Sequence, residues 1–206
     1  MRKKRPLDRS TNFVRDANLI VIASEDTFAV RQYFEFFQST RIQFRVLETE
    51  NGRSSPRHVL KRLDEYRKEF DIGEGDEFWI VLDTDHWIDS GHVKNLTHVL
   101  RACRQKGIQV AFCNPSFELW LLLHFAEFPT EDTLTRADVE TRIRAAVGAY
   151  NKTKIYDLPI DLDRVKTAVE RSRINQPASR GIPDRPQTGI HRIIEHLLDR
   201  GIIDVS

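Results

Sequence analysis

The fold is decided by one stretch near the middle of the chain, Asp76-Glu77-Phe78-Trp79-Ile80-Val81-Leu82-Asp83-Thr84-Asp85-His86-Trp87. Its apolar run, 78–82, is short and bounded by charged residues, which is typical of a strand buried in a parallel sheet. Side chains two apart on an extended chain point the same way, so Asp83 and Asp85 can share one face. Crowded carboxylates favour binding of Mg²⁺ or Mn²⁺. The same D-x-D can also be a turn with a side-chain cap before a helix.

The composition is that of a folded domain without a global basic excess. The 206 residues are 40% hydrophobic and 31% charged, with a net charge of +1 at pH 7, so charge alone does not indicate a nucleic-acid partner. Cys103 and Cys113 lack a metal-ligand spacing, which fits reduced thiols in the cytoplasm. Neither a signal peptide nor a membrane-spanning stretch is visible, so we expect a cytoplasmic protein with no membrane partner.

Apolar runs and helical stripes alternate along the chain. We predict strands at 19–23, 44–47, 78–82 and 108–113, separated by helices that begin near 27, 56 and 93. This alternation predicts an α/β fold with a mainly parallel sheet flanked by helices. The domains would be a flexible basic tail at 1–18, an α/β core at 19–128, and a helical C-terminal extension at 129–206 that packs on the core.

Acidic residues follow two of the predicted strands. Glu25 comes after the first and Asp83 with Asp85 after the central one, and ligands of open α/β sheets collect at the carboxyl ends of strands. If these strands are neighbours, the carboxylates converge and can hold metal that orients a phosphodiester and activates water. Glu118, in a helix that is otherwise apolar, could be a further ligand, a general base, or the partner of a buried Arg or of backbone donors.

Three more polar residues could contact a substrate. Asn114 lies at the end of the strand before the helix of Glu118, and His86 is next to the D-x-D, where it could donate a proton or contact a phosphate. Lys152 could neutralise a phosphate. Each also has an ordinary explanation, because charged and polar loop residues are usually just solvated. His124 is predicted to be a core histidine with its hydrogen bonds satisfied.

One stretch is specific enough to resemble a known family. The run Asn114-Pro115-Ser116-Phe117-Glu118-Leu119-Trp120, together with Glu25 and the D-x-D, resembles the RloB-like family, whose members are found beside restriction–modification genes and in phage-defence (abortive infection) systems. That family is similar to TOPRIM proteins, in which a Glu and a D-x-D bind Mg²⁺. The resemblance implies a TOPRIM-like sheet, a metal site of Glu25, Asp83 and Asp85, and a nuclease acting on RNA, such as tRNA, more than on DNA.

Two functions stay open at this stage. The first is a Mg²⁺-dependent nuclease effector of bacterial anti-phage defence, with catalytic Glu25, Asp83, Asp85 and Glu118. The second is a non-catalytic subunit that binds a partner or a nucleotide in a defence complex. Asp26 stands where family members usually carry Gly after the first Glu, which favours the second slightly. A partner protein is expected in both, and an oligomer is possible.

Overall fold

The structure, a computed structural model, describes residues 2–7, 17–39, 41–49, 52–85, 93–174, 181–199 and 204–205. The strands in these ranges are β1 (Asn18–Ser24), β2 (Phe37–Gln38), β3 (Ile42–Leu47), β4 (Glu77–Asp83), β5 (Gln109–Asn114), β6 (Gln187–Thr188) and β7 (Asp204–Val205). The helices are α1 (Ala29–Glu35), α2 (Pro56–Glu69), α3 (Val93–Gln105), α4 (Glu118–Leu122), α5 (Arg136–Val147), the 3-10 turn η1 (Ile155–Asp157), α6 (Leu162–Arg173) and α7 (His191–Asp199).

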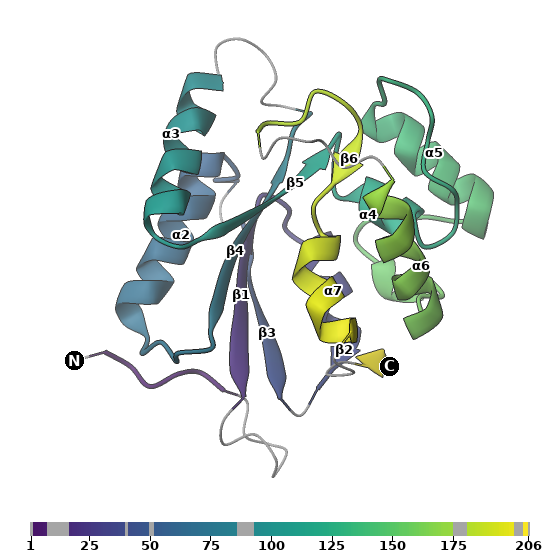
Figure 1. The fold of residues 1–206 in the computed structure, drawn as a ribbon. Coiled ribbons are helices and arrows are strands. Elements are labelled where there is room, and N and C mark those ends of the chain that lie inside the picture. The colour runs from purple at the N-terminus through teal and green to yellow at the C-terminus, as the bar shows by residue number, and fades with distance from the viewer. Residues whose placement is uncertain are drawn as a thin grey trace.

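A five-stranded sheet in the order β3-β1-β4-β5-β6 forms the centre of the molecule (Figure 1). The pairs β1–β3, β1–β4 and β4–β5 are parallel, and β6 runs antiparallel to the end of β5. The predicted α/β fold with a mainly parallel sheet is therefore confirmed, and it is compatible with the TOPRIM-like fold that the resemblance implies. The strand that carries the D-x-D, β4, is the middle one, with β1 and β5 on either side.

The two faces of the sheet are covered by different helices. Phe78, Ile80 and Leu82 of β4 pack with residues of α2 and α3, and the alternate residues Trp79 and Val81 pack with residues of α1 and α4 to α7. This is the period of two that a strand buried on both faces requires. Figure 1 shows the same division, with α2 and α3 on one side of the sheet and α4 to α7 toward the other.

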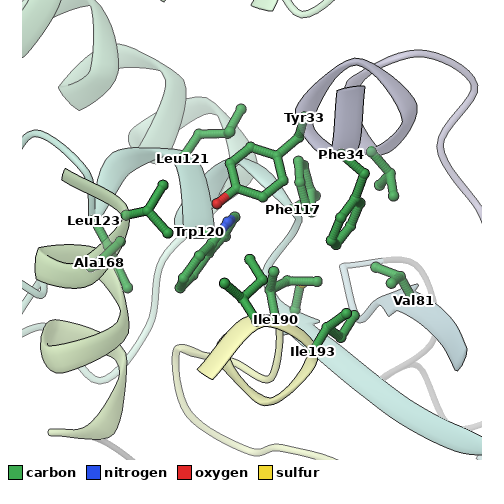
Figure 2. Packing of buried hydrophobic residues seen from close by; sticks show 14 of the residues in the cluster. Tyr33, Phe34, Val81, Phe117, Trp120, Leu121, Leu123, Ala168, Ile190 and Ile193 are labelled. Carbon is green, nitrogen blue, oxygen red and sulfur yellow. The ribbon is translucent and has the colours of Figure 1, made fainter. Parts of the chain in front are cut away.

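Tyr33 of α1 lies in the middle of an aromatic cluster on the second face. Its ring meets those of Phe34, Phe117 and Trp120 edge to face, with centroids 5.4, 5.8 and 6.0 Å away, a favourable geometry for aromatic pairs. Figure 2 shows Ile193, from α7, beside this cluster. The helices after residue 129 therefore share one hydrophobic core with the sheet.

Local signals set the ends of several helices. Pro56 begins α2 directly after Ser55, a position that suits its fixed φ. Gly107, at a φ of +66°, follows the end of α3, as glycine often does. Thr135 and Asp138 form a reciprocal capping box at the start of α5.

In the described ranges, no helix combines the length and the apolar character needed to cross a bilayer.

Residues 2–7 are anchored, although we predicted a tail through residue 18. The backbone of Lys3 bridges to Phe70 beyond the end of α2, and Arg5 forms an ion pair with Asp76, whose side chain is only 2% exposed. The buried carboxylate of Asp76 requires a cationic partner, and Arg5 supplies it. The two residues are far apart in sequence, so the sequence alone does not predict this contact. Residues 8–16, the middle of the predicted tail, lie outside the described residues.

Two further segments differ from the sequence-based expectation. The helix predicted from residue 27 to about 38 covers only Ala29–Glu35, because the chain leaves it to form β2, which pairs with β7. β6, which is not among the four predicted strands, joins the main sheet beside β5. Both differences involve strands of two residues, too short for an alternating pattern to be recognised.

Candidate functional site

The D-x-D lies where β4 ends, against the turn that follows β5. Oδ1 of Asp83 accepts the backbone N–H of Phe117 at 2.9 Å. The backbone N–H groups of Thr84 and Asp85 both donate to the carbonyl of Pro115 at 3.1 Å. The turn after β5 therefore fixes the backbone of the D-x-D and turns one oxygen of Asp83 toward the start of α4.

Glu25 lies at the same end of the sheet, one strand away. Ser24, the last residue of β1, is paired in register with Val81 of β4, so Glu25 follows β1 at nearly the level where Asp83 ends β4. The hydroxyl of Thr49 donates to the carbonyls of Ser24 and Glu25 at 3.0 and 2.9 Å, which holds this turn in place. The expectation that the strands of Glu25 and Asp83 are neighbours is thus confirmed.

Glu118 reaches the cluster from the first residue of α4. It is 2% exposed, and the hydroxyl of Tyr150 donates to its Oε1 at 3.4 Å. Its other oxygen, Oε2, lies 3.8 Å from Nε of Arg136. A buried arginine partner was one of the explanations that the sequence left open for Glu118, and the geometry supplies that partner in Arg136. The catalytic role of Glu118 is not tested by this contact.

Arg136, a residue that the sequence analysis missed, lies among these carboxylates. Its Nη2 is 2.7 Å from Oδ2 of Asp83 and 3.1 Å from Oδ2 of Asp85. It is the first residue of α5, and the capping box of Thr135 and Asp138 places it there. The sequence signal Thr-x-x-Asp could have located this helix start, but nothing local in the sequence predicts the contact with β4.

The electrostatics show that the acids converge. Burial raises the pKa of Asp83 well above its usual value, and the negative charges of Glu118, Glu25 and Asp85 raise it further, against the opposing effect of Arg136. Burial disfavours the charged guanidinium of Arg136, but the charges of Asp83, Glu118 and Asp85 outweigh that effect and raise its pKa. The charges of all four predicted catalytic acids thus meet at Asp83, and three of the acids, Asp83, Asp85 and Glu118, lie around Arg136.

Asp26, next to Glu25, binds backbone N–H groups at the start of α1. Its Oδ1 accepts the backbone N–H of Phe28 at 2.7 Å and also that of Ala29. These are N–H groups that the start of α1 leaves without intrahelical partners. Asp26 therefore caps α1, as a residue at this place in the sequence often does.

Two of the three predicted substrate contacts, Asn114 and Lys152, lie in different surroundings. Asn114 is buried, and its amide donates to the carbonyls of Arg185 and Pro183 at 2.8 and 3.4 Å, so it holds the segment before β6. Lys152 is exposed, two residues beyond Tyr150, in a loop whose backbone is held by Gln32. His86 lies outside the described residues. The substrate-binding roles of all three stay predictions.

His124 takes the structural role expected of it, and two tryptophans lie in the same core. His124 is 2% exposed and bonds to the carbonyl of Trp120 and the hydroxyl of Tyr33 at 3.0 and 3.2 Å. Trp79 and Trp120 are buried in the core. These residues support the second face of the sheet, and none of them enters the acidic cluster.

The donor atoms of the cluster suit a hard cation. Carboxylate oxygens are the usual protein ligands of Mg²⁺ and Mn²⁺, and Asp83, Asp85, Glu118 and Glu25 offer no nitrogen or sulfur. Among the residues that the structure describes, however, no three His, Cys, Asp or Glu side chains are arranged to hold a metal ion. The guanidinium of Arg136 lies among the carboxylates that would have to coordinate such an ion.

Comparison with known proteins yields one match. A family model described as RloB-like protein matches residues 20–197, which includes both sides of the acidic cluster and most of the helices that follow. No curated protein and no solved structure gives a match. Because the matched range covers most of the 206 residues, the chain belongs to the RloB-like protein family.

Proposed function

We propose that the protein is a metal-dependent nuclease that hydrolyses phosphodiester bonds of RNA. One observation carries the proposal: a single cationic group lies 2.7, 3.1 and 3.8 Å from Asp83, Asp85 and Glu118. A position that is surrounded by carboxylates at the carboxyl end of neighbouring parallel strands is suited to a divalent cation. The proposed metal ligands are Glu25, Asp83 and Asp85, and the proposed metal is Mg²⁺ or Mn²⁺.

Different residues of the chain would have different roles in the hydrolysis of a phosphodiester. A bound Mg²⁺ would orient the phosphodiester and stabilise the charge that builds on its oxygens. Glu118 would act as a general base that accepts a proton from the attacking water; it is a buried carboxylate, and the hydroxyl of Tyr150 donates to its Oε1 at 3.4 Å. The exposed Lys152, two residues after Tyr150, would meet a phosphate farther along the substrate.

The preference for RNA over DNA, the role in bacterial anti-phage defence and a protein partner are parts of the same proposal. They rest on the resemblance to defence-associated proteins and on membership of the RloB-like family. Expression of the protein in bacteria, followed by sequencing of newly formed RNA and DNA ends, tests the substrate. New ends confined to DNA would contradict the RNA assignment and leave the metal site intact.

Cleavage assays on variants test the catalytic assignment. The purified protein should cut RNA in the presence of Mn²⁺ or Mg²⁺ and stop when EDTA is added. Asp83→Asn and Glu25→Gln should keep the fold and lose cleavage, because each removes one proposed ligand. Asp163→Asn, on α6 with a side chain 93% exposed, is the matched control and should cut normally. A folded Asp83→Asn or Glu25→Gln protein that still cuts would refute the assignment.

A non-catalytic function is the second candidate, and Arg136 favours it. Its guanidinium already neutralises part of the acidic cluster, so the scaffold could serve to bind a partner or a nucleotide without metal. Titration calorimetry with Mn²⁺ and Mg²⁺ distinguishes the two candidates. If the folded protein binds neither ion at millimolar concentration, the second candidate is favoured.

A further inference from the structure

Arg136 occupies an unusual position for a cation. It is the first residue of α5, and the N-terminus of a helix carries the positive end of the helix dipole, which disfavours positive side chains. The first turn of α5 does contain Asp138, but Asp138 is engaged in the capping box with Thr135. The position of Arg136 is therefore favoured by the carboxylates opposite it and not by its own helix.

Each side-chain oxygen of Asp83 accepts one hydrogen bond. Oδ1 accepts the backbone N–H of Phe117 at 2.9 Å, and Oδ2 accepts Nη2 of Arg136 at 2.7 Å. The N–H of Phe117 belongs to the backbone next to α4 and cannot leave without moving that helix. Nη2 of Arg136 lies between Oδ2 of Asp83 and Oδ2 of Asp85, so a cation that bridges these two oxygens must take the place of the guanidinium.

The guanidinium of Arg136 is able to leave. Its side chain is 31% exposed, whereas those of Asp83 and Glu118 are 9% and 3% exposed. Its Nε is buried and makes no hydrogen bond among the described residues, and it lies 3.8 Å from Oε2 of Glu118. The group is thus held mainly through Nη2, and one rotation of a long, flexible side chain toward solvent would free the carboxylates.

We propose that Arg136 and a divalent cation compete for the same carboxylate oxygens, so that Arg136 sets the metal affinity of the site. The inference rests on the proposed function, since it takes Asp83 and Asp85 as metal ligands. In the metal-free protein the positive charge of the guanidinium compensates the negative charges of the buried acids. Without a cation, repulsion between these buried carboxylates would lower the stability of the fold. A metal binds only to the fraction of molecules in which the guanidinium has left, which weakens its apparent affinity by that fraction.

Removal of the competing cation should tighten metal binding. Titration calorimetry with Mn²⁺ should give a dissociation constant about tenfold or more lower for Arg136→Gln and Arg136→Ala than for the unaltered protein. Arg136→Lys, which keeps the charge, should stay close to the unaltered protein. Arg142→Ala is the matched control on the same helix, because Arg142 pairs with the exposed Glu131, and it should not change Mn²⁺ binding.

A stability measurement keeps the test informative if a variant folds poorly. Arg136→Gln should melt at a lower temperature without metal and recover when Mn²⁺ is added, more than the unaltered protein does, because the ion then replaces the lost cation. If the unaltered protein binds Mn²⁺ and the neutral variants bind it no more tightly, competition is refuted while the nuclease proposal survives. If neither the unaltered protein nor any variant binds Mn²⁺ or Mg²⁺, the metal site itself fails, and this inference with it.

Discussion

The buried histidine of α4's C-terminal turn should make the protein sensitive to mild acid. His124 donates from Nδ1 to the carbonyl of Trp120 at 3.0 Å, and its Nε2 accepts the hydroxyl hydrogen of Tyr33 at 3.2 Å. The ring is therefore neutral in the folded protein. The pKa of His124 is lowered from 6.5 to about 4, mainly by burial and also by the charges of Arg164 and Arg171, which together outweigh two backbone hydrogen bonds that raise it.

The sign and size of the effect follow from linkage. Between the pKa of the unfolded chain, 6.5, and that of the folded protein, about 4, the unfolded state binds more protons, so stability falls as the pH falls through this window. The full difference corresponds to about 3 kcal/mol, and about 2.5 kcal/mol of it is lost between about pH 7.5 and about pH 4.5. Above the window this contribution is fully present.

The comparison of two variants isolates this contribution from other titrating groups. His124→Asn removes the titrating ring and keeps an N–H that can reach the carbonyl of Trp120, whereas His58→Asn, on the exposed surface of α2, is the control. Urea unfolding at both pH values gives the free energy of unfolding for each protein. The advantage of the unaltered protein over His124→Asn should shrink by about 2.5 kcal/mol at the lower pH, and the advantage over His58→Asn should stay constant. An equal advantage over His124→Asn at both pH values would refute the reasoning.

Three further substitutions test contacts that position the site. Gln32→Leu should lower the free energy of unfolding by about 1–3 kcal/mol in urea titrations, because it leaves the buried N–H of Ile155 without the acceptor now 2.8 Å away. Asp26→Ala should cost about 1 kcal/mol by the same measurement through loss of the cap of α1; an unchanged stability would show that Asp26 is not a cap. Asn114→Ala should speed proteolysis within 181–186, which its amide holds at 2.8 Å through the carbonyl of Arg185, and an unaltered digestion pattern would contradict that role.

The sequence predicts well those helices and strands whose own residues carry a clear pattern. The strand 78–82 is recognisable because five apolar residues in a row stand between acidic ones, and the structure extends it by only one residue at each end. The helix that begins at Pro56 has a start signal and a regular apolar stripe, and it is found at 56–69. Long elements with their own pattern need no tertiary information to be located.

The parts that the sequence does not predict depend on contacts between distant residues. The pair β2–β7 joins Phe37 with Val205, and each of its strands is only two residues long. Arg136 is 53 positions from Asp83, in a segment whose sequence predicts only the start of a helix. Side-chain pairing of this kind is decided by how the helices pack on the sheet, which a single sequence with no alignment does not reveal.

Two buried Asp–Arg contacts in the same chain differ in their balance of charge. Asp76, 2% exposed at its side chain, has one arginine partner, Arg5, and its oxygens also accept the backbone N–H groups of Leu19 and Gly73 at 2.8 and 2.7 Å. That pair has one charge of each sign and a full set of donors, which is how a buried ion pair stabilises a fold.

At the end of β4 the balance is different. In the part of the chain that the structure describes, Arg136 faces Asp83, Asp85 and Glu118, and the charge of Glu25 adds to theirs at Asp83. A structural role would require no more acids than the arginine can neutralise, and burial of the surplus acids lowers stability. A buried acid with a strongly raised pKa, such as Asp83, among other carboxylates at the carboxyl end of a parallel sheet is instead typical of a site that binds a further cation. The excess of negative charge at this position, more than the presence of any one residue, is therefore the strongest reason to look for a metal there.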